Sequence, residues 1–489
     1  MSTTTETSKT TLKTFPPVVL DTTLYQLLLD DLPAGEALET YCTVKPNSDP
    51  QHGEAVPLSN KYIIHAAQLD DSDDLAHLQL EICSYLLMFF CGPMKVIFLG
   101  AEGASKDPTL SQKVVDENAK RSFAVIALEQ RPVIYTYANQ DDCAANHDGS
   151  KIRWAFAMDF AERLPYLFHP ELVYKMNSKR WLAESDLKSA NDRIIDCNII
   201  CPQNEEGLKH WYHCGATCES CKDGIRKETE RIRAVLQERQ IPFVLKLTQS
   251  LSSVGTNIVT NEEERSAVID KITDYLQEYL PRITRTNGHL YTTALILSDA
   301  IPGKTMALNF YVRRNGTAHF LGACHQLATG ESGRQATAIT YADQEGLEKK
   351  YRSTLARNAK ALHDLGYWGP VGADIMEDPS DGTLFTIDLN VRTPLSLVLH
   401  LLKGHFNDTR GLGVALVYEC VILRISRDEL EDRFFKEFDE GRLVLLGGTQ
   451  LGDDGKWAFG VVIAGKNKDE IDALSDRILR YETDDQVDD

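Results

Sequence analysis

The chain has 489 residues, of which 43% are hydrophobic and 25% are charged, and its formal net charge is −20. This balance is typical of globular proteins, and the length allows two or three domains. The negative charge argues against general binding to nucleic acid and to anionic membranes, which both require clustered Lys and Arg.

The first residues, "MSTTTETSKTTLKTF", are polar and rich in Thr, and they lack the apolar core of a secretory signal. We expect a disordered arm over residues 1–16 and an acidic tail over residues 483–489, which end in "TDDQVDD". Without a signal peptide, the eleven cysteines favour a reducing compartment, and we therefore expect a cytoplasmic protein.

Residues 17–170 alternate strand-like runs ("KVIFLGA", "SFAVIAL", "PVIYTYA") with helix-like stretches ("DPTLSQKVVDENAKR", "KIRWAFAMDFAERLPYL"). This alternation predicts a layered α/β domain. The apolar stretch "ICSYLLMFFCGPMKVIFLG" (82–100) is interrupted at its centre by Pro93 and Lys95, which argues against a membrane span. We expect a buried helix, a turn and a buried strand there, although the same surface could form a homodimer interface.

The next region, residues 171–290, contains two helical patterns, "ELVYKMNSKRWLAESDLKSANDR" and "KETERIRAVLQER". An insert with cysteines, residues 197–221, lies between them. A strand, "IPFVLKL", follows and carries Lys246, and the loop after it, "TQSLSSVGTNIVTNEEE", is rich in small residues that bring backbone N–H groups close to phosphates. Lys179 lies where a helix begins near Asn177 and could reach the same place. A solvated surface lysine is the alternative interpretation of each.

Residues 291–482 contain further strands and helices. A hairpin is predicted in "KTMALNFYVRRNGTAHFLGACHQL", where Asn315-Gly316 is a strong two-residue turn signal. A long helix, "QEGLEKKYRSTLARNAKALHDLG", then ends at Gly366, and the strands "WGPVGADIMED" and "TLFTIDLNVR" are joined by the turn "PSDG". The region closes with the strand pair "LVLLGGTQ" and "WAFGVVIAG" and a helix over 469–481.

The strand "TLFTIDLNVR" carries polar side chains at every second position. Asp388, Asn390 and Arg392 should share one face, since side chains alternate along a strand. The residues expected to enter the core are Ile387, Leu389 and Val391. If the preceding strand pairs antiparallel through the "PSDG" turn, Asp374 reaches the same face as Asp388.

Two carboxylates and an amide oxygen form a hard oxygen cluster of the kind that Mg²⁺ accepts beside nucleotide phosphates. The neighbouring Arg392 could hold a phosphate or a carboxylate with two hydrogen bonds. The alternative is a solvated strand face with a surface ion pair.

The order of these features resembles that of the ATP-grasp superfamily over about residues 171–470: a lysine on a helix, a lysine on a strand, a loop of small residues, a hairpin, Asp374 and "IDLNVR". More closely, the chain is similar to the fungal solid-state-culture-specific ATP-grasp proteins. The resemblance implies an α/β fold, with α+β lobes, in which an N-terminal α/β domain (17–170) precedes a first lobe (171–290) and a second lobe (291–482).

By this resemblance, Asp374, Asp388 and Asn390 would hold Mg²⁺, while Lys179 and Lys246 would contact the phosphates of ATP. The loop residues that would fold over the triphosphate are Ser250, Ser252, Ser253 and Gly255. The residues expected at the rest of the nucleotide are Ser298 and Ile301, with backbone hydrogen bonds to adenine, Asp299 near the ribose, and His325 and Gln326 near the phosphates.

The sequence departs from the family in three places. Ser298 stands where members usually carry a glutamate, Thr305 lies near a position that often holds another acid, and the residues after Arg392 lack the usual glycine and serine. A histidine such as His325 is also a common structural residue within a strand.

The activity implied is an ATP- and Mg-dependent carboxylate–amine ligase that acts through an acylphosphate, with Arg392 and Lys246 as catalytic residues. The expected substrates are small molecules, plausibly amino acids, that are joined by an amide or dipeptide-like bond in specialised metabolism. The alternatives are a small-molecule kinase on the same fold and a nucleotide-binding regulatory protein without turnover.

The insert contains "HWYHCGATCESC" (210–221), in which Cys214, Cys218 and Cys221 have a spacing suited to a metal. Three thiolates and a fourth ligand would suit structural zinc. The same spacing occurs in radical S-adenosylmethionine enzymes, where it holds an iron–sulfur cluster. Free thiols are the third possibility in a reducing compartment.

Overall fold

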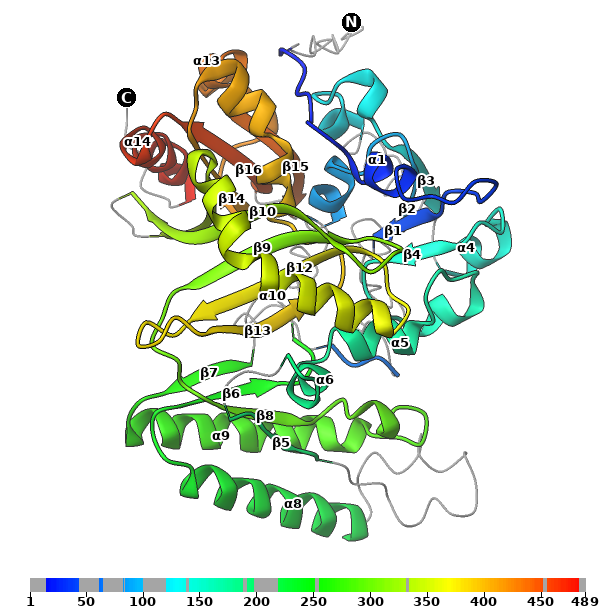
Figure 1. The fold of residues 1–489 in the computed structure, drawn as a ribbon, viewed down its shortest axis with the longest axis vertical. Helices are drawn as coiled ribbons and strands as arrows, with labels where there is room; N and C mark the ends of the chain where they lie inside the picture. Colours follow the sequence, from blue (N-terminus) through cyan, green and yellow to red (C-terminus); the bar gives the residue numbers. More distant parts are fainter. Residues whose placement is uncertain are drawn as a thin grey trace, which may run out of the picture.

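The computed structural model describes residues 15–43, 61–64, 82, 84–99, 120–137, 140–187, 191–197, 219–250, 255–330, 334–451 and 455–482. These residues form three β-sheets with helices packed around them (Figure 1). The predicted fold class, an α/β domain followed by two lobes, is confirmed. Residues 1–14 of the expected arm and the expected tail lie outside the described residues, as do Cys214 and Cys218.

The N-terminal sheet is parallel, with the strand order β3-β2-β1-β4. Its strands are β1 (Thr40–Thr43), β2 (Lys95–Leu99), β3 (Val133–Tyr137) and β4 (Ile152–Trp154), and its helices include α1 (Leu24–Leu29) and α4 (Gln140–Asn146). Parallel pairing agrees with the predicted α/β domain, because parallel strands need crossover connections.

Two local predictions in this domain are wrong. "SFAVIAL" forms no strand: residues 120–123 are helical, and Ile126 makes only an isolated bridge to Val18. "KIRWAFAMDFAERLPYL" begins with strand β4 instead of a helix. All three β4 residues are buried, so the one-sided pattern of a surface helix does not apply to them.

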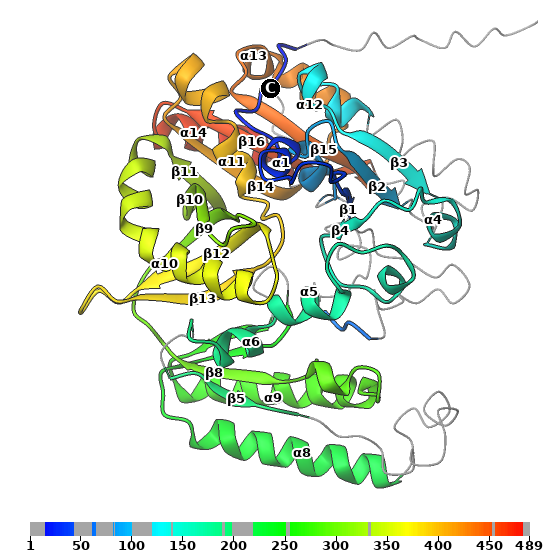
Figure 2. The same cartoon turned by 45° about the vertical axis from the view of Figure 1, so that its right-hand side comes forward.

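The small sheet is antiparallel, with the order β5-β8-β6-β7. Its strands are β5 (Arg193–Ile195), β6 (Phe243–Leu247), β7 (Thr256–Val259) and β8 (Leu295–Asp299). Helices α8 (Glu219–Glu238) and α9 (Glu262–Tyr279) lie on one side of it (Figure 2) and share a core with it. The strand β8 belongs to this sheet although it follows the expected lobe boundary at residue 290, which stays a prediction.

The large sheet has eight antiparallel strands in the order β13-β12-β9-β10-β11-β14-β16-β15. Its strands are β9 (Thr305–Val312), β10 (Ala318–Thr329), β11 (Arg334–Thr340), β12 (Gly369–Glu377), β13 (Leu384–Asn390), β14 (Val414–Leu423), β15 (Leu443–Leu451) and β16 (Lys456–Gly465). The helices packed with it or near its β15 end are α10 (Gln344–Asp364), α12 (Arg427–Arg433), α13 (Phe435–Asp439) and α14 (Lys468–Leu479). The predicted hairpin, long helix, turn between β12 and β13, and final strand pair are confirmed.

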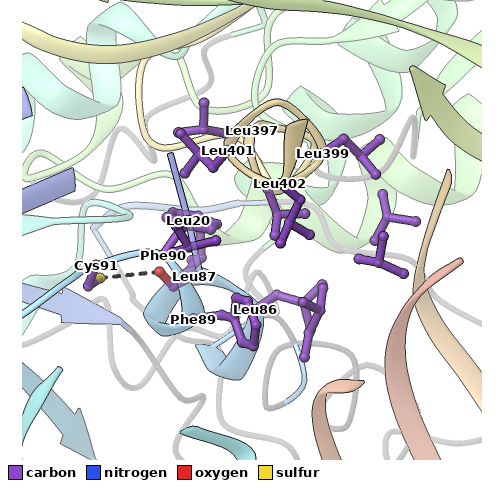
Figure 3. Packing of buried hydrophobic residues seen from close by; sticks show 14 of the residues in the cluster. Leu20, Leu86, Leu87, Phe89, Phe90, Cys91, Leu397, Leu399, Leu401 and Leu402 are labelled. Carbon is purple, nitrogen blue, oxygen red and sulfur yellow. Dashed lines mark hydrogen bonds between the residues drawn. The ribbon is translucent and has the colours of Figure 1, made fainter. Parts of the chain in front are cut away.

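The largest core joins the N-terminal domain to the large sheet. Helical residues 84–89 pack near α11 (Leu397–Leu401), and side chains such as Leu86, Phe90 and Leu401 lie in this core (Figure 3). The predicted buried helix, turn and strand over 82–100 are confirmed for the described residues. Because Leu86 and Phe90 are almost fully buried within the chain, they are not available for a dimer interface. No helix in the described ranges has the length and apolar character to cross a membrane.

Candidate functional site

A cavity of about 550 Å³, here named the main cavity, lies between the small and large sheets. Its walls come from the start of α6 (Lys179–Glu184), from β6, β7 and β8, and from β9, β10, β12 and β13 of the large sheet. The predicted site residues that line it are Lys179, Lys246, Ser298, Asp299, Ile301, His325, Gln326, Asp374 and Asp388. Residues that are far apart in the sequence, from Lys179 to Asp388, therefore meet in one space.

Asp374 and Asp388 lie directly opposite each other on β12 and β13, which pair antiparallel as expected. The register shifts between Asp374 and Ile375, so that the strand β13 has an extra residue, Ile387, at this point. Such a bulge turns neighbouring side chains to one face. Ile387 consequently lines the cavity beside Asp388, and the prediction that it enters the core is wrong.

The electrostatics of this carboxylate pair favour a bound cation. Burial and the neighbouring Asp388 both raise the pKa of Asp374 above its ordinary value. Lys179 Nζ lies 3.3 Å from Asp388 Oδ1. Facing carboxylates are hard oxygen ligands, so the residues fit a divalent cation such as Mg²⁺. In the described part of the chain, this pair included, no group of three or more His, Cys, Asp and Glu side chains comes together in a metal-binding arrangement.

Lys179 is held in place by the junction of α5 (Pro170–Met176) and α6. Ser178 caps α6, since its hydroxyl accepts from Arg180 N at 3.1 Å, and it also forms a hydrogen bond with Thr248 Oγ1 at 2.8 Å. The Lys179 backbone N–H donates to Thr248 O at 2.9 Å. Lys179 Nζ also donates to Ser250 Oγ at 3.4 Å. The lysine is therefore fixed at the cavity and is not a solvated surface charge.

Lys246 on β6 is only 8% exposed, which also excludes a surface role. Its Nζ donates to Ile387 O at 2.9 Å, so it bridges the small sheet to β13 of the large sheet. Burial lowers the pKa of Lys246, while the nearby carboxylates of Asp388 and Asp374 oppose this change. The amino group of Lys246 thus lies beside the acid pair.

Part of the wall of the main cavity is apolar. Its apolar lining residues include Val244, Ile258, Ile301 and Met376, of which only Ile301 was expected from the sequence. They could have been recognised only by knowing which strands face each other. Ser298 is 3% exposed, and its hydroxyl has no hydrogen-bond partner among the described residues.

The remaining predicted nucleotide residues at the cavity are Asp299, His325 and Gln326, and both Asp299 and Gln326 have hydrogen-bond partners. The carboxylate of Asp299 accepts from Arg239 at 2.5 Å and also from Asn191. Gln326 Nε2 donates to Thr337 Oγ1 at 3.3 Å. Burial lowers the pKa of His325, which favours the neutral imidazole.

A second and much smaller space, here named the side pocket, adjoins the main cavity. Lys179 and Asp388 line both spaces. Asn390, Arg392 and Ser250 line the side pocket only. The predicted polar face of β13 therefore contributes to both spaces: Asp388 lies between them, while Asn390 and Arg392 face the side pocket.

Arg392 is oriented by contacts from three directions. Its Nη1 donates to Asn390 Oδ1 at 2.5 Å and lies 3.5 Å from Asn177 Oδ1. Asn177 Oδ1 also accepts from Val391 N at 2.9 Å. The guanidinium carbon lies 5.0 Å from the centre of the Phe156 ring, a cation–π distance. Neither Asn177 nor Phe156 was expected at the site.

Other predicted residues lie apart from both spaces or outside the described ranges. Gly255 has a φ of +70°, and a Cβ there would meet the side chain of Leu247, so the position requires glycine. Ser252 and Ser253 lie outside the described residues. Cys221 falls in the first turn of α8, but its side chain is not described, so the zinc prediction for Cys214, Cys218 and Cys221 stays a prediction.

No known protein family matches the sequence, and no curated protein matches it. Among solved structures, the chain is similar to N5-carboxyaminoimidazole synthetase from Staphylococcus aureus complexed with ADP, at 10% identity and a TM-score of 0.45, over 92% of this chain and 98% of that one. It is also similar to L-amino acid ligase from Bacillus licheniformis, at 13% identity and a TM-score of 0.43, over 83% and 95% of the two chains. Phosphoribosylamine–glycine ligase from Thermotoga maritima is similar at 12% identity and a TM-score of 0.44, over 82% and 94%. Because these similarities are remote, we argue the chemistry of the site only from the residues of this chain.

Proposed function

We propose that the protein is an ATP-grasp ligase that joins a carboxylate to an amine while converting ATP to ADP and phosphate. The observation that carries this proposal is that Lys179 and Asp388 line both the main cavity and the side pocket that contains Arg392. The terminal phosphate of a nucleotide in the main cavity would thus lie beside a substrate carboxylate in the side pocket.

The main cavity suits ATP in size and in the distribution of its polar groups. Its volume falls within the range of about 300–1,000 Å³ that is usual for small-molecule sites. The apolar end would take the base, with the backbone of Ser298 and Ile301 as hydrogen-bonding groups, and Asp299 would lie on the ribose side. Lys179 and Lys246 would hold the phosphates, whose negative charge they complement.

We propose that Asp374, Asp388 and Asn390 hold Mg²⁺. When bound, the ion would reduce the negative charge of the phosphates and so favour attack by an anionic carboxylate. The lysines would keep the triphosphate in line with the side pocket, and we propose that Ser250, Ser252, Ser253 and Gly255 would cover it. His325 and Gln326 would flank the phosphates from β10.

The reaction needs no side-chain nucleophile. A substrate carboxylate oxygen would attack the γ-phosphorus, the bond to the β–γ bridging oxygen would break, and ADP would leave. The amine would then attack the acyl carbon of the acylphosphate, phosphate would leave, and the nitrogen would lose a proton. Arg392 would orient the carboxylate and the acylphosphate, while Lys246 would stabilise charge on the transferring group, so catalysis comes from positioning and electrostatics.

We further propose that both substrates are small, with amino acids among them, and that the product belongs to specialised metabolism in the cytoplasm. The small volume of the side pocket, about 20 Å³, supports a small carboxylate. No contact with nucleic acid or membrane is needed for this activity. A lobe boundary after β8 fits the way in which the two sheets enclose the cavity.

Hydroxylamine provides a test that does not depend on knowing the amine, because it converts any acylphosphate to a hydroxamate. The protein would be incubated with ATP, Mg²⁺, hydroxylamine and single carboxylates, and ADP and hydroxamate would be measured by mass spectrometry. Native amines would then be tested with each active carboxylate.

A hydroxamate formed in equal amount with ADP would support the ligase. A stable phosphorylated product without hydroxamate would point instead to a kinase. Binding of ATP with no ADP release for any carboxylate would contradict both enzymatic activities and favour a nucleotide-binding regulatory protein.

A further inference from the structure

The side pocket has an apolar wall that the proposed chemistry does not use. Beyond the groups near the phosphates, its lining includes Ile64, Phe156, Ala157, Val173 and Leu389. Phe156 and Ala157 come from the bend that follows β4, at the carboxyl end of a parallel strand, where ligands of α/β sheets commonly bind. The N-terminal domain therefore supplies part of the wall.

Polar side chains at this wall already have partners. Tyr174 Oη donates to Ile63 O at 2.6 Å, and Gln249 Nε2 donates to Tyr174 O. The amide nitrogen of Asn177 donates to Val173 O at 2.8 Å. Among the described residues that line the pocket, Lys179 and Arg392 are the cations, and both lie on the side of Asp388. A second carboxylate on a substrate would thus meet apolar surface, which is unfavourable.

The space limits the length of the substrate. The pocket holds about 20 Å³, little more than the roughly 10–15 Å³ that a single water needs. Ala157 and Val173 are buried and pack in a cluster with Tyr62 and Tyr174, so these parts of the wall are fixed. Phe156 is only partly buried, and its ring also contacts the guanidinium of Arg392.

We infer that the carboxylate substrate bears a short apolar side chain without a second carboxylate, and that the ring of Phe156 sets its maximum length. This inference rests on the proposed function, because it takes the side pocket as the carboxylate site. Arg392 holds the carboxylate, and the apolar wall beside it receives the side chain. Phe156 is thus a specificity-determining residue.

The experiment compares the wild type with Phe156→Ala and the milder Phe156→Leu in the hydroxamate assay. The acids are acetate, propionate, butyrate, hexanoate and alanine, with succinate and aspartate as acids that carry a second carboxylate. Phe168→Leu is the matched control, because Phe168 also lies near an arginine, 5.2 Å from Arg153, but does not line the pocket.

We expect the wild type to prefer acetate, propionate and alanine over hexanoate, succinate and aspartate by at least about tenfold in kcat/KM. Phe156→Ala should raise the ratio of hexanoate to propionate by about tenfold or more, with a smaller rise in Phe156→Leu. The KM for ATP should stay within about twofold, and Phe168→Leu should keep the wild-type profile. Equal length profiles in the wild type and both Phe156 variants would overturn the inference, as would a wild-type preference for succinate or aspartate.

A binding measurement separates this inference from the proposed function. The thermal stability of each variant would be recorded with the same acids in the presence of a non-hydrolysable ATP analogue and Mg²⁺, since a ligand stabilises the state that binds it. If no acid yields a hydroxamate but short apolar acids alone stabilise the wild type, the ligase proposal fails while the pocket assignment stands. Stabilisation that does not depend on chain length or on Phe156, or no stabilisation by any acid, would overturn the assignment.

Discussion

The main cavity and the side pocket share two residues but are built in different ways. Most side chains of the main cavity project from paired strands of two sheets, so the hydrogen-bond ladders fix their positions. The side pocket is assembled from the α5–α6 junction, the bend after β4 and the residues that end β13. Connecting segments vary more readily than strands, because they tolerate changes without loss of the core. Under the proposed function, the sheets would supply most of the groups that hold the nucleotide, and the connections would supply the wall that selects the carboxylate.

This division predicts two kinds of variant. Changes in the main cavity should impair the reaction with every carboxylate to the same degree, because all substrates would need the same nucleotide. Changes at the side pocket should alter the ranking of carboxylates while leaving ATP binding nearly intact.

The largest effect is expected for Asp388→Asn, at the boundary of the two spaces. The substitution removes a carboxylate that faces Asp374 and lies 3.3 Å from Lys179. Hydroxamate formation should fall by about 10²–10³-fold with every carboxylate, as for the loss of a preorganised electrostatic group. The protein should remain folded, since repulsion of Asp374 is relieved, and circular dichroism during thermal unfolding would verify this. Full turnover by this variant would refute the metal site.

Arg392→Lys should have the next largest effect and should distinguish the two spaces. Lysine keeps the charge but loses the planar fork that contacts Asn390, Asn177 and Phe156. We expect kcat/KM for the carboxylate to fall by about 10²-fold, whereas the affinity for ATP, measured by calorimetry, should change by less than about threefold. An equal loss of ATP affinity would place Arg392 in the nucleotide site instead.

The pH dependence of stability tests the buried acid pair in the absence of metal. The pKa of Asp374 is raised in the folded state, so between the unfolded value of about 4 and the folded value the folded protein binds more protons. Its contribution to stability is therefore present at low pH and is lost as the pH rises through the folded pKa. The loss amounts to about 1.4 kcal/mol for each pH unit that separates the folded pKa from the unfolded pKa.

Asp374→Asn should remove this decline, because an amide does not titrate. Urea unfolding of the wild type and the variant from pH 4 to 8 would measure the difference, with Asp381→Asn, at an exposed turn, as the control. Mg²⁺ should stabilise the wild type more strongly as the pH rises. Parallel curves for the wild type and Asp374→Asn would contradict the raised pKa.

The sequence was informative where side chains project from regular strands. The alternation in "TLFTIDLNVR" and the "PSDG" turn indicated that Asp374 and Asp388 lie on two paired strands, but an unbroken register would pair Asp374 with Ile387, and only the extra residue brings Asp388 opposite Asp374. The bulge that turns Ile387 into the cavity has no such signal, because an extra residue in a strand looks the same as a regular one. The presence of both acids on this strand pair could thus be predicted, but their direct pairing and the apolar wall beside them could not.

The side pocket was missed because Phe156 and Asn177 meet Arg392 only through the docking of distant segments. A single sequence does not reveal which connecting segments converge in space. The prediction of the fold was wrong locally at "SFAVIAL". Its apolar run suits a strand, but tertiary packing makes it the end of a helix and a turn. The strand β14 (Val414–Leu423) was overlooked despite a run of apolar and β-branched residues.

The smallest effect is expected for Ser298→Ala at the apolar end of the main cavity. If adenine is bound by the backbone of Ser298, as proposed, removal of the hydroxyl should change the KM for ATP by less than about threefold. The hydroxyl is buried without a hydrogen-bond partner among the described residues, so its loss should leave stability unchanged or raise it by about 1 kcal/mol. Titration with ATP and GTP would measure both affinities. A loss of ATP affinity of tenfold or more, with no loss for GTP, would show that the side chain itself selects the base, and the strands would then determine nucleotide choice as well as reaction chemistry.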